Sequence, residues 1–123
     1  MKALVIGITG SGATMPSSYA LGRLPVGVMN KTEQAYANEL ALRMQVGEIL
    51  WWKFEGVKLR LADSTFYSPD FFVMLADCSM EVVEIKGHWS DDARVKTKVA
   101  ASMYPFRFRA LKKTRAGWEV EEF

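Results

Sequence analysis

The sequence has only one cysteine, Cys78, and one histidine, His88, among its 123 residues. These counts exclude an intrachain disulfide, a cysteine-rich zinc site and a cluster of imidazoles, and they favour a reducing cytoplasm. No apolar run approaches the roughly 20 residues of a membrane-spanning helix. The apolar stretch after Lys2 is short and interrupted by Gly7, so we expect neither a secretory signal nor membrane insertion.

A nucleotide-binding loop is also missing. Residues 7–14, GITGSGAT, imitate the phosphate-binding pattern GxxxxGK[ST], but Ala13 stands where that pattern requires lysine. The prolines and glycines that follow disfavour the helix that such a loop precedes. We therefore expect no nucleotide cofactor, and we interpret residues 1–29 as an irregular arm with a short strand at 3–8.

Half of the residues are hydrophobic, which is typical of a globular protein, and the length allows one domain, expected at 30–123. The charge is unevenly spread. Residues 1–85 carry seven Lys or Arg and nine Asp or Glu, whereas residues 86–123 carry nine and five. An acidic site beside a basic surface suits a metal-using enzyme with a polyanionic substrate, although a solvated surface gives the same statistic.

The hydrophobic pattern predicts an α/β fold in which a central mixed β-sheet is flanked by α-helices. Helices are expected at 30–46 and 90–103. Strands are expected at 49–54, 57–61, 106–110 and 118–120, and two more are expected within 67–89.

The expected faces of these elements follow from the same periodicity. In the first helix Glu33 aligns with Ala37, Leu40 and Met44, on the stripe that faces the core. In the second helix the expected buried stripe is Val95, Val99 and Met103. In the strand at 106–110 we expect the apolar residues to point inward and both arginines outward.

The strand that contains Glu84 should lie near the middle of the sheet, because Val82, Val83 and Ile85 are apolar and β-branched. Glu84 and Lys86 share one face of it, and burying them costs several kcal/mol unless a partner compensates. A turn at 77–79 pairs this strand with the one that follows Pro69 and Asp70. Asp70, Glu84 and Lys86 can therefore meet in one pocket.

Two carboxylates with a third ligand nearby suit Mg²⁺, which prefers oxygen donors. A lysine beside them could orient or deprotonate an attacking water, or offset charge on a phosphoryl oxygen. The pattern thus favours hydrolysis of a phosphodiester. The alternative is that Glu84 and Lys86 form an exposed pair and that Asp70 is an ordinary turn residue.

The Pro69-Asp70 pair, the fourteen residues from Asp70 to Glu84, and Glu84-Ile85-Lys86 resemble the PD-(D/E)XK nuclease superfamily. Around them, YSPDFF at 67–72 and VEIKGHWSDDARVK at 83–96 look like bacteriophage endonuclease I-like Holliday junction resolvases, and the likeness covers roughly residues 30–111. It implies a restriction-endonuclease-like core and a Mg²⁺-dependent, structure-selective DNA endonuclease, for which Mn²⁺ substitutes. It also implies a homodimer that acts on branched DNA, in the host cytoplasm if the protein is phage-encoded.

The resemblance also implies roles for single residues. Asp70, Glu84 and the Ile85 carbonyl would hold metal, with Glu33 as the further acidic residue, and Lys86 would be catalytic together with the three acids. For Glu33 the alternative is a capping-box acid at the start of its helix.

Cations on the outer faces of the expected elements are candidates for contacts with DNA phosphates. They are Lys58, Arg60, Arg94, Lys98, Arg107 and Arg109. Two alternative functions remain open, a nicking or flap-cutting nuclease with the same active site and a non-catalytic nucleic-acid-binding protein on the same fold.

Overall fold

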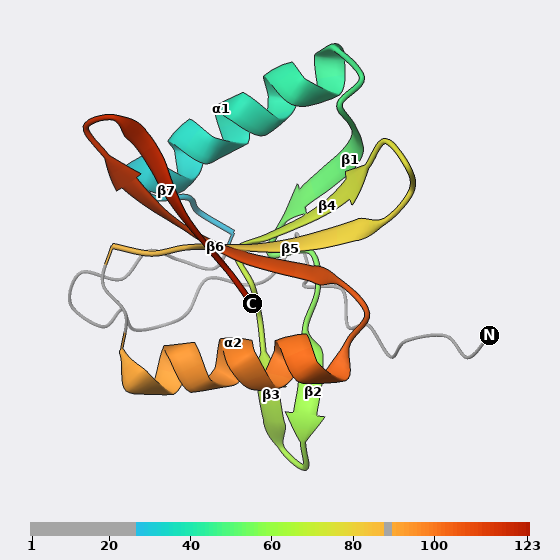
Figure 1. Cartoon of the computed structure of the whole chain (residues 1–123), viewed down its shortest axis with the longest axis vertical. Helices are drawn as coiled ribbons and strands as arrows, with labels where there is room; N and C mark the ends of the chain where they lie inside the picture. Colours follow the sequence, from blue (N-terminus) through green and yellow to red (C-terminus); the bar gives the residue numbers. More distant parts are fainter. Residues whose placement is uncertain (1–26, 88–89) are drawn as a thin grey trace.

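A computed structural model of the chain describes residues 27–87 and 90–123. Within these residues two helices and seven strands follow one another in the order α1 Lys31–Gln45, β1 Ile49–Phe54, β2 Leu59–Ala62, β3 Thr65–Tyr67, β4 Phe71–Leu75, β5 Met80–Ile85, α2 Asp91–Met103, β6 Arg107–Thr114 and β7 Gly117–Glu122 (Figure 1). The strand expected at 3–8, nearly all of the arm at 1–29, and His88 lie outside the described residues.

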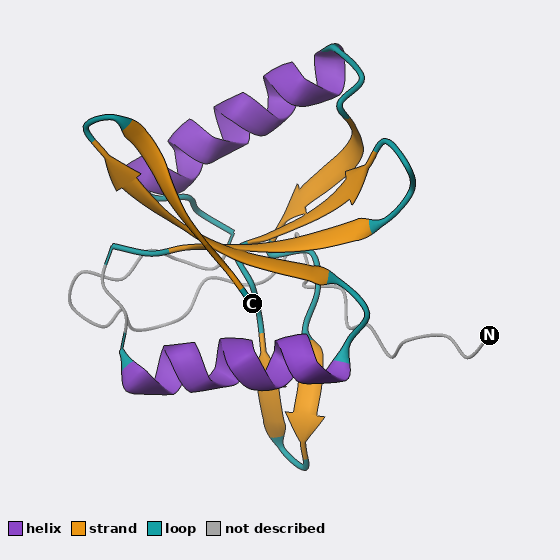
Figure 2. Cartoon of the chain, in the orientation of Figure 1, coloured by secondary structure: helices purple, strands orange, loops and turns teal. Residues whose placement is uncertain are grey.

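Five strands form a mixed sheet in the order β1-β4-β5-β6-β7, in which only the β5–β6 pair is parallel. Strands β2 and β3 form a separate antiparallel hairpin. Figure 2 shows the sheet between the two helices. The prediction of an α/β fold with a mixed sheet is confirmed, and so is the central position of the strand that contains Glu84.

Each face of the sheet buries its own core. On one face Tyr36 and Leu40 of α1 pack on Phe71 and Val83. On the other face α2 and the β2–β3 hairpin pack on Phe108 and neighbouring strand residues. Within the described residues, neither helix is long and apolar enough to cross a membrane.

Helix α1 begins where the sequence predicts. Asn30 accepts a hydrogen bond from the backbone N–H of Glu33, and a Glu33 carboxylate oxygen accepts one from the N–H of Asn30, each at 2.8–2.9 Å. Ala37 and Leu40 are buried as predicted, but Met44 is 44% exposed. The buried stripe of α1 therefore ends before the last turn.

The predicted buried stripe of α2 is wrong. Val95, Val99 and Met103 are exposed, whereas Thr97 and Ala100 are buried. The reason is the volume already present on this face of the sheet, where large aromatic side chains fill the core. Both stripes have helical spacing. Only the stripe with the smaller side chains fits, because a helix that presents small residues can approach such a surface closely.

The prediction that both arginines of β6 point outward holds for Arg107, whose side chain is 50% exposed, but not for Arg109. The Arg109 side chain is only 20% exposed and donates to Glu81, which is 1% exposed, at 3.3 Å. Arg107 lies 3.8 Å from the same carboxylate and also pairs with Glu122 at 3.0 Å. Arg109 lies opposite Val83 of β5, which belongs to the core beneath α1, so its guanidinium is partly buried there and needs a charged partner.

Candidate active site

The two acidic residues of the predicted motif are brought together by the register of the β4–β5 hairpin. Phe71 lies opposite Val83, and the pairs continue toward the turn at 77–79. Extending this register by one position places Asp70, just before β4, opposite Glu84, near the end of β5. The separation of fourteen residues in the sequence is therefore the separation that antiparallel pairing requires.

Direct contacts tie these residues together. The backbone N–H of Ile85 donates to the Asp70 carboxylate (Oδ2) at 2.7 Å. The Lys86 ammonium lies 3.9 Å from the Glu84 carboxylate (Oε1). Glu84 is only 5% exposed, so the alternative of an exposed Glu84–Lys86 pair is wrong.

Glu33 reaches the same site from α1. Its carboxylate accepts a hydrogen bond from the N–H of Asn30 and also lies within hydrogen-bonding reach of the Asp70 carboxyl group. The capping role and a place beside Asp70 are therefore compatible. Burial raises the pKa of Glu33, and the charge of Asp70 adds to the rise.

The electrostatics of the site show an excess of negative charge in a poorly hydrated place. Burial, and then the charge of Glu84, raises the pKa of Asp70 from 3.8 to about 8. Burial also raises the pKa of Glu84, although the nearby Lys86 opposes this effect. One lysine does not compensate three carboxyl groups, so in the absence of another cation the site retains protons.

Two further residues, which the sequence analysis did not single out, belong to the surroundings of this site. Tyr67 is buried, and its hydroxyl donates to the Glu84 carboxylate (Oε1) at 3.3 Å. The hydroxyl of Thr97, on α2, lies 3.5 Å from that of Tyr67. Burial and the charge of Glu84 raise the pKa of Tyr67 far above its usual range, so this hydroxyl stays a donor. The available signal was that a buried tyrosine needs a partner for its hydroxyl.

The donors at this site fit a magnesium ion in part. Asp70 and Glu84 offer carboxylate oxygens and the strand end offers the Ile85 carbonyl, all of which are hard ligands. Within the described residues, no group of three or more His, Cys, Asp or Glu side chains forms a metal-binding set. Mg²⁺ commonly takes one or two carboxylates and completes its shell with water and substrate phosphate, so two carboxylates meet its requirement from the protein.

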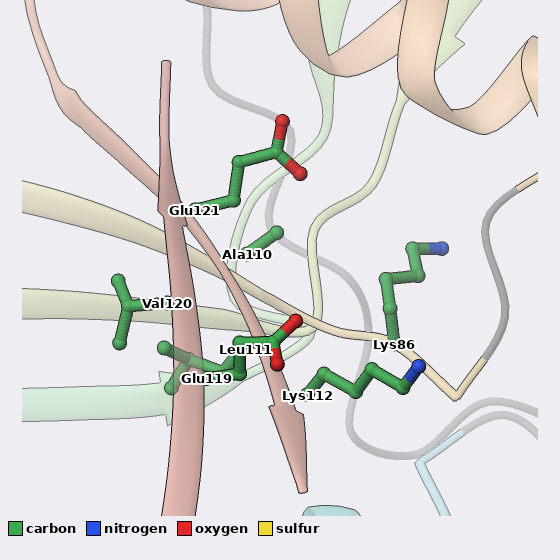
Figure 3. A pocket seen from close by; sticks show the side chains of 7 residues that line it. All are labelled: Lys86, Ala110, Leu111, Lys112, Glu119, Val120 and Glu121. Atoms are coloured by element: carbon green, nitrogen blue, oxygen red, sulfur yellow. The ribbon is translucent and has the colours of Figure 1, made fainter.

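Lys86 also borders a small pocket of about 60 Å³ on the β6–β7 hairpin (Figure 3). Lys112 and Glu119, which lie opposite each other on β6 and β7, are part of its lining. In Figure 3 the side chains of Lys86 and Glu121 extend to the same side of the hairpin. Lys112 is thus a second lysine that borders the same pocket as Lys86.

The six cations predicted to contact DNA fall into two groups. Arg107 and Arg109 pair with Glu81, on the α1 face and near the start of β5. The other four lie on the side of the sheet that α2 and the β2–β3 hairpin cover, and they are Lys58, Arg60, Arg94 and Lys98.

The second group has varied surroundings. The Arg94 guanidinium pairs with Glu121, and Arg60 pairs with Asp63 at 3.4 Å. Lys98 lines, together with Arg94, a hollow of about 470 Å³ beside the chain end. Contact with DNA remains a prediction for both groups.

Comparison of the chain with protein-family models, curated proteins and solved structures found no match.

Proposed function

We propose that this protein is a Mg²⁺-dependent DNA endonuclease of the PD-(D/E)XK type, with a restriction-endonuclease-like core. The observation that carries the proposal is the meeting of Asp70 and Glu84 across the β4–β5 register, with Lys86 beside them and Glu33 arriving from α1. A buried acidic pair next to a lysine at the end of a central strand is costly for folding. Such a cost is common at catalytic sites.

In the proposed enzyme Asp70, Glu84 and the Ile85 carbonyl hold the metal, and Glu33 lies beside Asp70 as a further acid. A bound Mg²⁺ supplies a Lewis acid for the phosphoryl group and an activated water. Lys86 contributes a positive charge where negative charge develops on the phosphate, and can orient the attacking water. The raised pKa values of Asp70 and Glu84 are consistent with a site whose charge a divalent cation would balance.

The charge distribution supports a nucleic acid as the substrate. Lys98 on α2 and Lys58 beside the β2–β3 hairpin share the side of the sheet from which Tyr67 and Thr97 approach Glu84. Arg94 lies on the same side, but it is paired with Glu121. Cations flanking a cleavage site hold the phosphate backbone without reading bases. Arg107 and Arg109 contribute less in this proposal, because both pair with Glu81.

Among DNA substrates we propose branched DNA, the substrate of the phage-type Holliday junction resolvases that the motif resembles. One domain of this size offers one site, so cleavage of two strands requires a homodimer. We propose a cytoplasmic protein, in the host cell if it is phage-encoded.

Digestion of a synthetic four-way junction, a flap, a nicked duplex and a linear duplex, each with and without Mg²⁺ or Mn²⁺, tests the proposal. We expect metal-dependent cleavage that favours the junction and is lost in Asp70→Asn and Lys86→Ala. The matched control is Asp63→Asn, because Asp63 is an exposed aspartate on the β2–β3 turn. Cleavage that survives both site variants would refute the assignment of the site.

The same digestion separates the alternatives. Preference for the nicked or flap substrate favours a nuclease of the same superfamily with another DNA preference. Binding to DNA without cleavage under any metal condition favours a non-catalytic nucleic-acid-binding protein on this fold.

A further inference from the structure

The hydroxyl group of Tyr67 is not needed for packing. The Tyr67 ring lies in the core beneath α2, with Leu59 and Phe108, where a phenylalanine ring would occupy nearly the same space. Burying a hydroxyl is unfavourable unless it is hydrogen-bonded. In this protein its acceptor is a carboxylate of the candidate site, Glu84, and not a backbone carbonyl.

The contacts of Glu84 show what that hydroxyl does. Both Tyr67, at 3.3 Å, and Lys86, at 3.9 Å, approach the same carboxylate oxygen, Oε1. Because the carboxylate is planar and attached to the strand, two contacts to one of its oxygens restrict the direction in which the other oxygen points. The 3.3 Å distance is long for a hydrogen bond to a charged oxygen, but bonds at catalytic sites are often long before ligand binds.

The support extends to α2. Thr97 is 1% exposed, its hydroxyl donates to the Ala93 carbonyl at 2.9 Å, and it lies 3.5 Å from the Tyr67 hydroxyl. Thr97 therefore limits where the Tyr67 hydroxyl can move. The residues 67, 84 and 97 come from β3, β5 and α2, so three separate elements define the position of one carboxylate.

We infer that Tyr67 is a positioning residue that orients the Glu84 carboxylate toward a divalent cation, with Thr97 as its support. This inference rests on the proposed function, because it assumes that Glu84 takes part in a metal site. Partners that orient a metal ligand typically change metal affinity by about 10- to 100-fold when they are removed. The effect should therefore appear in metal binding itself.

The chain provides a matched control in Tyr36. This tyrosine is also buried, at 3% exposure, but it belongs to α1 and packs against the other face of the sheet. Its hydroxyl has no hydrogen-bond partner within the described part of the chain. Tyr36→Phe and Tyr67→Phe thus remove the same atom from two buried rings, and only the second removal takes a donor from Glu84.

The experiment measures Mn²⁺ binding to the full chain by calorimetry, without DNA, for the wild type, Tyr67→Phe, Thr97→Val and Tyr36→Phe. We expect the dissociation constant to rise about tenfold or more in Tyr67→Phe. It should rise by a smaller factor in Thr97→Val, and change by less than about twofold in Tyr36→Phe. Thermal unfolding without metal shows whether each variant is folded, and Thr97→Val is the second probe should Tyr67→Phe melt early.

Cleavage of the four-way junction at increasing Mg²⁺ then distinguishes positioning from packing. A positioning role raises the Mg²⁺ concentration for half-maximal rate in Tyr67→Phe, and saturating Mg²⁺ restores most of the rate. Damage to the core lowers the rate at every Mg²⁺ concentration. Junction binding in Ca²⁺ should stay unchanged, because Tyr67 is buried away from solvent.

The outcomes separate the two proposals. Equal Mn²⁺ affinity in the wild type, Tyr67→Phe and Thr97→Val would overturn the role of Tyr67 and leave the nuclease proposal standing. Mn²⁺ binding that weakens as expected in a protein that cuts no DNA would support the role of Tyr67 and overturn the nuclease proposal. A wild type that binds no Mn²⁺ and cuts no DNA in Mg²⁺ or Mn²⁺ would overturn both.

Discussion

Replacing Asp70 by asparagine should stabilise the metal-free protein while it abolishes the proposed activity. The Asp70 carboxylate accepts the N–H of Ile85 and lies against the carboxyl group of Glu84. An asparagine of the same shape keeps an oxygen for Ile85 and turns an NH₂ donor toward Glu84. The substitution therefore removes a like-charge repulsion and keeps the hydrogen bond that orders the strand end.

The size and the pH dependence of this gain in stability follow from the pKa of Asp70, which changes from 3.8 to about 8 on folding. Between these two values the folded state holds a proton that the unfolded state lacks, so the stability of the wild type falls as the pH rises. One pKa unit corresponds to about 1.4 kcal/mol, which gives an upper limit of roughly 4 kcal/mol at pH 7. Because Glu84 titrates together with Asp70 and the site can relax, we expect a measured gain of about 1–3 kcal/mol.

Urea unfolding from pH 5 to pH 9 in EDTA, followed by the fluorescence of the four tryptophans, measures this difference. The gain of Asp70→Asn over the wild type should grow as the pH rises toward 8 and then level off. Adding Mg²⁺ should stabilise the wild type, by about 2.7 kcal/mol at 100 times its dissociation constant, but not the variant. Asp63→Asn, on an exposed turn, should behave like the wild type in both measurements, with no gain in stability without metal and with the same stabilisation by Mg²⁺. A loss of stability in metal-free Asp70→Asn at pH 8, or a difference that does not vary with pH, would contradict the reasoning.

Three further predictions concern other parts of the molecule. Lys86→Ala should lower junction cleavage by about 100-fold or more and leave junction binding in Ca²⁺ nearly unchanged, which gel shift and single-turnover digestion can measure. Glu81→Gln should cost about 2–3 kcal/mol in urea unfolding because Arg109 loses its buried partner, yet Mn²⁺ affinity should not change; a neutral substitution would show that the pair is dispensable. Lys98→Ala should weaken junction binding and lower the slope of log affinity against log salt by about one, whereas an unchanged slope would remove Lys98 from the DNA-binding surface.

The sequence was most informative where one element determines the outcome. The caps of both helices, the turn at 77–79 and the central strand with Val82 and Val83 are local signals, and the structure contains each of them. The sequence was least informative where packing between elements determines which residues are buried. The spacing of Val95 and Val99 fits a buried stripe as well as the spacing of Thr97 and Ala100 does, and only the aromatic side chains of the sheet select the second.

The same distinction divides the candidate site. Asp70 and Glu84 could be predicted as neighbours because a single hairpin joins them, and its register follows from the turn and the apolar pattern. The residues that support Glu84 could not be predicted. Tyr67 and Thr97 lie 17 and 13 residues away from it, on elements whose packing the sequence does not specify. Glu33 is intermediate, because its helix face was predictable but its distance from β4 was not. A short motif can therefore indicate which residues meet a cation, whereas the residues that hold them in place become visible only when the elements are packed together.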